Sequence, residues 1–261
     1  MRIAAAQISC AVGDLEANVL KICEYSERAK AGGADLVVFP EMTDTGYSMS
    51  VIQKSASQWN DGPVPEIQKM AKQISITIVC GVSERDDDAV YNSQIVVDQT
   101  GKIVTKYRKV HLFGAPPNDE TKCFAPGKDL AHFASGDLRF GLSICYDLRF
   151  PELYRRLALK DNVNAFVVSS AWPMARIHHF HNLALARAIE NQCYVAAVNR
   201  VGTDDGVTHC GSSAIIDPYG ATMAAASPDR EELLQAELSA DVVTSVRSRI
   251  NFLADRRPDL Y

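Results

Sequence analysis

Apolar and polar positions along this chain follow two alternating patterns. Continuous apolar stretches at 2–8, 34–40 and 164–170 are typical of strands buried on both faces of a sheet. Apolar residues three and four positions apart, as in 15–32, are typical of amphipathic helices. The same criteria predict further strands and helices: strands at 76–82, 91–98, 102–110, 139–144, 193–199 and 233–238, and helices at 64–74, 151–159, 178–191 and from about 239.

Buried strands that alternate with amphipathic helices favour an α/β protein in which helices cover a sheet. No linker, low-complexity tract or charge block divides the sequence, so we expect one domain over residues 1–261. The second half repeats the strand and helix order of the first, without a residue-level repeat to prove that the halves are related.

Charge and composition narrow the classes of function. The net charge of −5 argues against nucleic-acid binding, because no basic excess is available to neutralise phosphates. No stretch approaches the roughly 20 apolar residues of a membrane span, and the first ten residues lack the apolar run of a signal peptide. Seven scattered cysteines without a CxxC pair predict free thiols in a reducing cytoplasm.

Three predicted strands end in ionisable residues: "LVVFPEM" at Glu41, "YRKVHLFG" at Lys109 and "GLSICYD" at Cys145. Such groups gather at the carboxyl ends of strands in open α/β sheets. The thiolate is the nucleophilic form of cysteine, so Cys145 needs a base, and Glu41 is the candidate. The Lys109 ammonium and the Tyr146 backbone N–H could stabilise an oxyanion. This combination predicts acyl transfer through a thioester.

The segments "FPEMTDTGY", "YRKVHLFG", E-x-x-x-F-x-P-G (Glu120 to Gly127) and "GLSICYDLRFPELYR" resemble the signature blocks of the nitrilase superfamily, the carbon–nitrogen hydrolases. The similarity continues through "ARAIENQCYVAAVNRVG", "GSSAIIDPYG" and "DRRPDLY". The resemblance implies an α-β-β-α sandwich that dimerises into a four-layer assembly. It also implies that the enzyme uses no metal and no organic cofactor.

The resemblance further implies a catalytic triad that matches Glu41, Lys109 and Cys145, with a second structural or catalytic glutamate that matches Glu120. Each residue also has a simpler interpretation. Cys145 could be a buried structural thiol, and Lys109 could belong to a solvated basic strand. Glu41 could be a charge at a helix N-terminus, and Glu120 could lie on a loop surface. A non-catalytic interaction protein that kept the fold is the alternative from another class, although its triad would be expected to have decayed.

Three histidines invite other interpretations. His178 and His181 share a predicted helix face, but two histidines without a cysteine or carboxylate partner make a poor metal site. His111 lies two residues after Lys109 and would point the same way on a strand, so it could line or support the pocket.

The segment "SSAWPMAR" places Trp172 and Arg176 in a loop after a strand, where they could bind substrate. Arg176 could hold a carboxylate with two parallel hydrogen bonds, or could be a surface charge. Tyr47, in the loop after Glu41, is another candidate pocket residue.

The motifs W-P-x-x-R, "RAIENQ" and "NRVG" are similar to those of the ω-amidase-like branch. This resemblance implies a small-molecule substrate, the ω-amide of a short α-keto dicarboxylate such as 2-oxoglutaramate, and release of ammonia. Hydrolysis of N-carbamoyl amines or N-carbamoyl amino acids, and of simple aliphatic amides, remain alternatives. The short chain fits these amidase branches better than true nitrilases.

Overall fold

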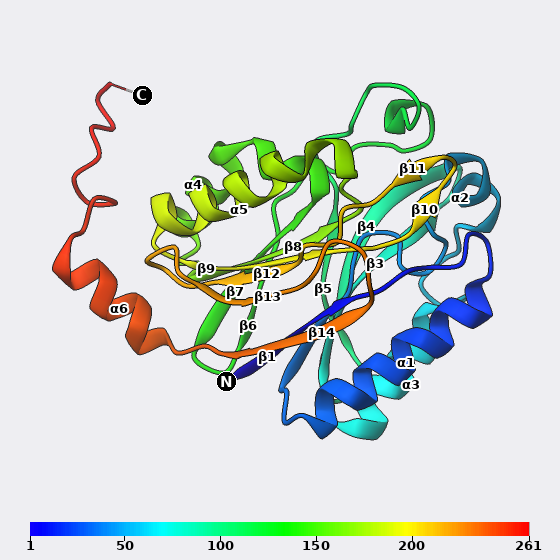
Figure 1. Ribbon diagram of the computed structural model, residues 1–261, viewed down its shortest axis with the longest axis horizontal. Helices are drawn as coiled ribbons and strands as arrows, with labels where there is room; N and C mark the ends of the chain where they lie inside the picture. The colour runs from blue at the N-terminus through cyan, green and yellow to red at the C-terminus, as the bar shows by residue number, and fades with distance from the viewer. Residues whose placement is uncertain (261) are drawn as a thin grey trace.

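The computed structural model describes residues 1–260, and within them the chain forms two six-stranded sheets (Figure 1). The first sheet has, in order, β14 (Glu232–Glu237), β1 (Arg2–Gln7), β2 (Leu36–Val38), β3 (Thr77–Asp86), β4 (Ala89–Val97) and β5 (Ile103–Arg108). The second has β13 (Thr222–Ala225), β12 (Ala214–Ile216), β9 (Tyr194–Asn199), β8 (Ala165–Ser170), β7 (Leu138–Ile144) and β6 (His132–Ser135).

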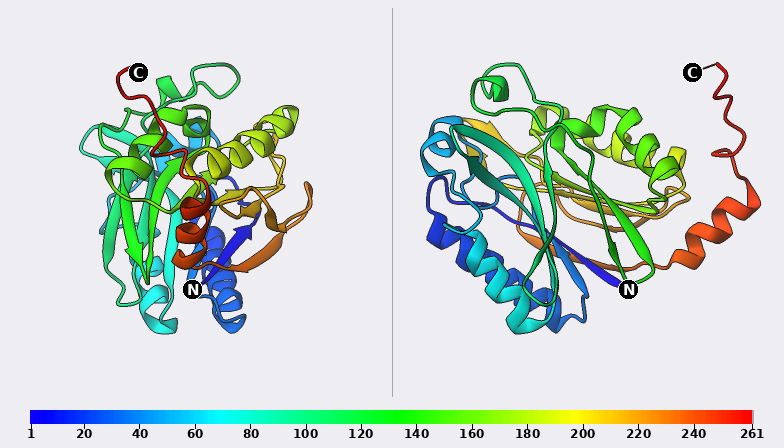
Figure 2. Two further views of the ribbon diagram at one scale, coloured as in Figure 1. Left: turned by 90° about the vertical axis from the view of Figure 1, so that its left-hand side faces the viewer. Right: turned by 180° about the vertical axis from the view of Figure 1, so that it is seen from behind.

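Helices cover the outer faces of both sheets. The helices α1 (Leu15–Ala31) and α3 (Val64–Ile74) pack on the first sheet, and α4 (Pro151–Lys160) and α5 (Ile177–Asn191) pack on the second (Figures 1 and 2). Alternation along β1 explains the layers, because Ile3 packs toward the second sheet whereas Ala4 packs with the residues of α1. The predicted α-β-β-α sandwich is confirmed.

The two sheets share one topology. In the first, β1, β2 and β3 are parallel and are followed by antiparallel β4 and β5. In the second, β7, β8 and β9 are parallel and are followed by antiparallel β12 and β13. The carboxyl ends of parallel strands lie at one edge of a sheet, so the residues after β2, β7 and β8 can meet between the two sheets.

The pattern located the long elements well, but it made β5 too long. The strand ends at Arg108 instead of 110, so Lys109 begins the following loop and the expectation that His111 shares its strand face is wrong. Several short elements were not predicted: α2 (Met49–Ser55), η1 (Glu120–Lys122), η2 (Cys145–Arg149), η3 (Met174–Arg176), β10 (Thr203–Asp204) and β11 (Val207–Thr208).

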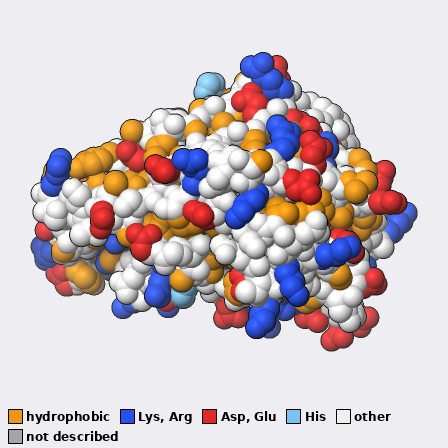
Figure 3. Space-filling model, turned by 90° about the horizontal axis from the view of Figure 1, so that it is seen from below, with side chains coloured by type: hydrophobic (Ala, Val, Ile, Leu, Met, Phe, Trp, Pro, Cys, Tyr) orange, Lys and Arg blue, Asp and Glu red, His pale blue; other side chains and the backbone are white. Residues whose placement is uncertain are grey.

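The C-terminal helix α6 (Ala240–Arg249) lies at one end of the molecule, with the end of the chain beyond it (Figure 1). In residues 1–260, none of the helices has the length and apolar character to cross a membrane. Basic and acidic side chains are interspersed over the face seen in Figure 3, instead of gathering in a basic patch.

Candidate active site

Cys145 is the first residue of η2 and follows directly on the last residue of β7, at a sharp turn of the chain. Its φ of 43° lies in the left-handed region, which side chains with a Cβ rarely adopt. The carboxylate of Asp147 stabilises this turn, because its Oδ2 accepts hydrogen bonds from the Ile144 N–H at 2.9 Å and the Tyr107 hydroxyl at 2.7 Å. Cys145 is only 8% exposed at this turn, and it is one of the residues that line a pocket.

Asp147 also ties this turn to the loop that carries Lys109. Its Oδ1 accepts a hydrogen bond from the His111 backbone N–H at 3.1 Å and lies 2.8 Å from His111 Nδ1. The His111 ring stacks on Phe150 with a centroid separation of 3.7 Å. His111 therefore supports the turn and does not line the pocket, and Asp147 is a residue that the motif analysis missed.

Lys109 lies between two carboxylates that are fully buried. Its Nζ is 2.8 Å from Glu41 Oε1 and 2.7 Å from Glu120 Oε1. Burial opposes the lysine charge, but the charges of Glu120 and Glu41 outweigh it and raise the pKa of Lys109. Burial raises the pKa of Glu120, against the opposing effect of Lys109. The structure thus brings Glu41, Lys109 and Glu120 into one cluster around a stable cation.

Neutral donors complete the hydrogen bonding of the two carboxylates. Asn92 of β4 donates to Glu41 Oε1 at 2.6 Å, and the Ala171 N–H donates to Glu41 Oε2 at 2.8 Å. The Tyr47 hydroxyl donates to Glu120 Oε1 at 2.6 Å, and the backbone N–H of Phe113 donates to Glu120 Oε2 at 2.7 Å. Sequence analysis missed Asn92, which has no motif of its own and lies 51 positions from Glu41.

The thiol of Cys145 is in an environment that disfavours the thiolate. Burial and the charges of Glu41 and Glu120 raise its pKa well above the ordinary value, while Lys109 acts in the opposite direction. The resting group is therefore a thiol, and its proton has to leave as the sulfur attacks. A carboxylate beside a buried thiol and an ammonium suits general-base-assisted nucleophilic attack.

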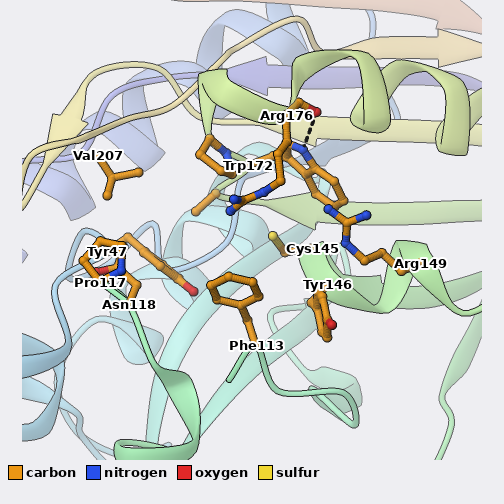
Figure 4. Close-up of a pocket in the computed structure, with 12 residues that line it drawn as sticks. Tyr47, Phe113, Pro117, Asn118, Cys145, Tyr146, Arg149, Trp172, Arg176 and Val207 are labelled. Atoms are coloured by element: carbon orange, nitrogen blue, oxygen red, sulfur yellow. Dashed lines mark hydrogen bonds between the residues drawn. The ribbon is translucent and has the colours of Figure 1, made fainter. Parts of the chain in front are cut away.

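The pocket beside Cys145 holds about 490 Å³ of empty space including its open mouth (Figure 4). The predicted binding residues Tyr47, Trp172 and Arg176 all line it, as does Tyr146. Trp172 also has a structural contact, because its indole Nε1 donates to the Arg176 carbonyl at 2.9 Å. The remaining lining residues come from four segments: Phe113, Pro117 and Asn118; Arg149; Ala171 and Pro173; and Val207.

Two arginines give the pocket a positive charge. The guanidinium of Arg149 lies 4.7 Å from the centre of the Trp172 ring, and that of Arg176 lies 5.3 Å from the centre of Phe113. Burial, reinforced by the charge of Arg176, lowers the pKa of Arg149. In the described part of the chain, neither guanidinium is within ion-pair distance of a carboxylate. The pocket therefore suits an anionic ligand, and Arg149 was not anticipated from the sequence.

Metal-ligating side chains were considered across residues 1–260. No group of three or more His, Cys, Asp or Glu in this part of the chain is placed to hold a metal ion. His178 and His181 lie on α5 without a third ligand. All seven cysteines are within the described residues and are free.

A sandwich with a buried Glu–Lys–Glu cluster beside a cysteine at a tight turn defines a class of hydrolase that acts through a thiol. Comparison with known families agrees, because the carbon–nitrogen hydrolase profile matches residues 2–248. The chain belongs to this family and is a carbon–nitrogen hydrolase. The alternative of a non-catalytic protein is therefore not retained.

Individual relatives are similar over nearly the whole chain. A 2-oxoglutaramate amidase from Bacillus subtilis is 34% identical over 99% of this chain and 98% of its own length. The omega-amidase NIT3 of Saccharomyces cerevisiae is 32% identical over 100% of this chain and 94% of its own, and its crystal structure gives a TM-score of 0.87.

An amidase from Nesterenkonia sp. AN1 is 26% identical, covering 100% of this chain and 95% of that one, with a TM-score of 0.88. This structure is of the E41Q mutant, and it shows covalent addition of the acetamide moiety of fluoroacetamide at the active-site cysteine.

Proposed function

We propose that this enzyme hydrolyses the ω-amide of a short α-keto dicarboxylate, with 2-oxoglutaramate as the representative substrate, and releases ammonia. The observation that carries the proposal is the pair of uncompensated guanidinium groups, Arg149 and Arg176, in the pocket of Cys145. An amide with a free carboxylate supplies both the bond to be cleaved and the missing negative charge. The similarity to a 2-oxoglutaramate amidase and to an omega-amidase supports the same substrate class.

In the proposed acylation step, Glu41 takes the proton of Cys145 as the sulfur attacks the amide carbonyl. The covalent adduct at the active-site cysteine of the E41Q mutant of the Nesterenkonia amidase supports a cysteine nucleophile. Lys109 stays protonated beside Glu41, so its ammonium can stabilise the developing oxyanion together with the Tyr146 N–H. The tetrahedral intermediate collapses, and Glu41 returns the proton to the departing ammonia.

In the proposed deacylation step, Glu41 removes a proton from water, which attacks the thioester carbonyl. The thiolate leaves, recovers the proton through Glu41, and the free dicarboxylate departs. Glu120 transfers no proton in this scheme; it fixes Lys109 through the 2.7 Å contact with Nζ. Each assisted proton transfer can contribute about 10²–10⁴-fold to the rate.

The substrate carboxylate would contact Arg176, whose planar guanidinium can donate two parallel hydrogen bonds. Arg149 contributes a second positive charge and, by packing on Trp172, forms part of the pocket wall. Tyr47 and Trp172 enclose the carbon chain, since both line the same pocket.

The test is ammonia release from a panel of 2-oxoglutaramate, 2-oxosuccinamate, glutamine, N-carbamoyl amino acids and simple aliphatic amides. The Cys145→Ala variant is the control for background hydrolysis. We expect turnover of the two α-keto amides to exceed that of the others. Wild-type rates in Cys145→Ala would refute the mechanism, whereas preference for another class would refute only the substrate assignment.

A simple aliphatic amidase is the second candidate, and the likeness to the Nesterenkonia amidase favours it. It requires no carboxylate on the substrate, so Arg176→Ala would leave kcat/KM unchanged. The ω-amidase proposal requires a loss of more than tenfold. Release of carbon dioxide together with ammonia would instead identify an N-carbamoyl substrate.

We also propose that the enzyme is a homodimer and works in the cytoplasm. Exposed apolar side chains on the C-terminal part, including Ile250 at 67% and Met223 at 41%, support association with a second copy. Free cysteines support a reducing compartment. A monomeric mass by light scattering at micromolar concentration would refute the dimer, and recovery in a secreted fraction would refute the location.

A further inference from the structure

A short hairpin, formed by β10 and β11, contributes one wall of the pocket. Its turn consists of Asp205 and Gly206, whose φ angles of 46° and 78° are both positive, as a two-residue hairpin turn of type I′ requires. Asp204 pairs with Val207 across the hairpin. Of the pocket-lining residues in the described chain, Val207 is the one that comes from beyond α5.

The two faces of this hairpin differ. Directly paired residues in an antiparallel ribbon place their side chains on one face, so Asp204 and Val207 share a face and the neighbouring Thr203–Thr208 pair has the other. Asp204 is buried and Val207 is half-buried against the pocket, whereas both threonines are exposed and join each other through their hydroxyls at 2.9 Å. The hairpin thus has one face toward the pocket and one toward solvent.

A two-stranded hairpin of this length is unstable by itself, and contacts to other pocket walls hold it in place. The first strand is held by Asp204, whose Oδ2 accepts from the Tyr47 N–H at 2.7 Å and whose Oδ1 accepts from Arg200 Nη2 at 3.0 Å. Asp204 and Arg200 are both buried, so their ion pair is little screened by solvent.

The second strand is held just after Thr208. His209 forms an isolated β-bridge with Pro173, and the Cys210 N–H donates to the Trp172 carbonyl at 2.9 Å. Tyr47, Trp172 and Pro173 all line the pocket. The position of the hairpin is consequently fixed relative to the walls that enclose the substrate.

Figure 4 shows Val207 on the opposite side of the pocket from Cys145, with Arg176 between them. A substrate acylated on Cys145 and extending past Arg176 would meet the Val207 side chain. A β-branched side chain has few rotamers, so Val207 is a stiff wall. We propose that Val207 sets the maximum length of the acyl group that the pocket accepts, and that Asp204 is the positioning residue that holds Val207 at this distance. The proposal deepens the proposed function, because it concerns the substrate range of the same pocket.

The test compares kcat/KM for four-, five- and six-carbon α-keto ω-amides in wild type, Val207→Ala and Val207→Gly. Discrimination of one methylene in an apolar pocket is about 10–200-fold. We expect both variants to raise the six-carbon to five-carbon ratio of kcat/KM by about tenfold, and Val207→Phe to lower it. Thr208→Ala, which alters the outer face of the same hairpin, is the matched control and should leave the ratio unchanged.

Asp204→Asn tests the positioning role. It should raise the same ratio while kcat for the shortest amide stays within a few-fold of wild type, a result that general loss of folding would not produce. Unchanged ratios in the folded Val207 variants would overturn the proposal, whatever Asp204→Asn does.

Failure of the Val207 proposal can be distinguished from failure of the proposed substrate class. If wild type turns over no α-keto ω-amide, the proposed substrate class fails. The same variants are then compared on unbranched aliphatic amides of two to six carbons, where Val207→Ala and Val207→Gly should again favour the longest members, and unchanged ratios would again refute the role of Val207.

Discussion

The buried cluster around Lys109 and the arginine pocket beside it differ in whether their cations have ion-pair partners. Lys109 is in contact with both Glu41 and Glu120, and each carboxylate has further hydrogen-bond donors. Arg149 and Arg176 are in the adjoining pocket, where residues 1–260 supply no ion-pair partner for either. The cation of the buried cluster is therefore paired without substrate, and the two cations of the pocket are not.

This difference separates catalysis from recognition. A buried ion cluster whose carboxylates are hydrogen-bonded is preorganised, so little reorganisation is needed when charge develops on the substrate. A pocket with unpaired cations gains most of its electrostatic stabilisation only when an anion binds. Changes in the cluster should therefore affect folding and turnover, whereas changes in the arginines should affect substrate affinity and choice.

The largest effect is expected for Lys109→Met, which leaves two buried carboxylates facing each other. Removal of one member of a buried ion pair costs about 3–5 kcal/mol of unfolding free energy. Turnover should fall by at least about 10³-fold, because the oxyanion also loses its cationic donor. Denaturant unfolding and ammonia release measure the two effects. Lys102→Met, at an exposed site before β5, is the control, and equal stability of both variants would contradict the cluster's role.

Glu41→Gln should separate two roles of Glu41: it is the base for the Cys145 thiol, and its negative charge raises the pKa of that thiol. Turnover should fall by about 10²–10⁴-fold through loss of the base. Burial is the largest cause of the raised pKa of Cys145, and the negative charge of Glu41 is the second. Removing that charge should therefore lower the pKa of Cys145. The thiolate should then form at lower pH than in wild type. Ultraviolet thiolate absorbance against pH, with Cys145→Ala subtracted, measures this, and titration at higher pH would contradict it.

Arg176→Met should raise KM for 2-oxoglutaramate more than tenfold and leave the kinetics of a neutral aliphatic amide nearly unchanged. The reason is loss of a charge-assisted, two-point contact with the carboxylate. Arg149→Met should have a smaller effect in the same direction. Arg156→Met, at an exposed site on α4, is the matched control. Equal loss with neutral and anionic amides would show that the arginines only support the pocket's shape.

The smallest effect on kcat/KM is expected from an increase in ionic strength. Screening weakens attraction of an anionic substrate to the arginines, so kcat/KM for 2-oxoglutaramate should fall about two- to threefold between low and physiological ionic strength. The buried cluster is shielded from solvent, so kcat should hardly change. Parallel measurements with a neutral amide provide the baseline, and the same salt dependence for both substrates would argue against an anion site.

The sequence pattern predicted an α/β protein because buried parallel strands and amphipathic helices have distinct periods over many residues, whereas the sandwich of two sheets followed from the resemblance to the nitrilase superfamily. It did not predict β10 and β11, because two residues per strand leave no measurable period. The end of β5 was misplaced because Lys109 and Val110 follow Arg108 without a turn residue, although the strand register with β4 ends at Arg108. Local pattern therefore located the scaffold and left the pocket's edges undefined.

Motif blocks identified Glu41, Lys109, Cys145 and Glu120, which the structure brings into one site. Asn92 and Asp147 were missed because their importance depends on contacts with residues 51 and 36 positions away. Arg149 lay inside a recognised block, but no sequence feature showed that its guanidinium faces the same space as Arg176. No sequence feature indicated Val207 as a pocket residue, since its role depends on a hairpin whose position is fixed by contacts with Tyr47 and Trp172.

The left-handed backbone at Cys145 has an evolutionary consequence. A residue with a Cβ in this conformation costs about 1–3 kcal/mol, whereas glycine adopts it freely. A descendant released from selection for hydrolysis could therefore gain stability by a single exchange to glycine at the very position that defines the enzyme. The cysteine persists against this thermodynamic gradient only while its chemistry is useful, which makes position 145 a sensitive indicator of whether a relative of this protein still hydrolyses amides.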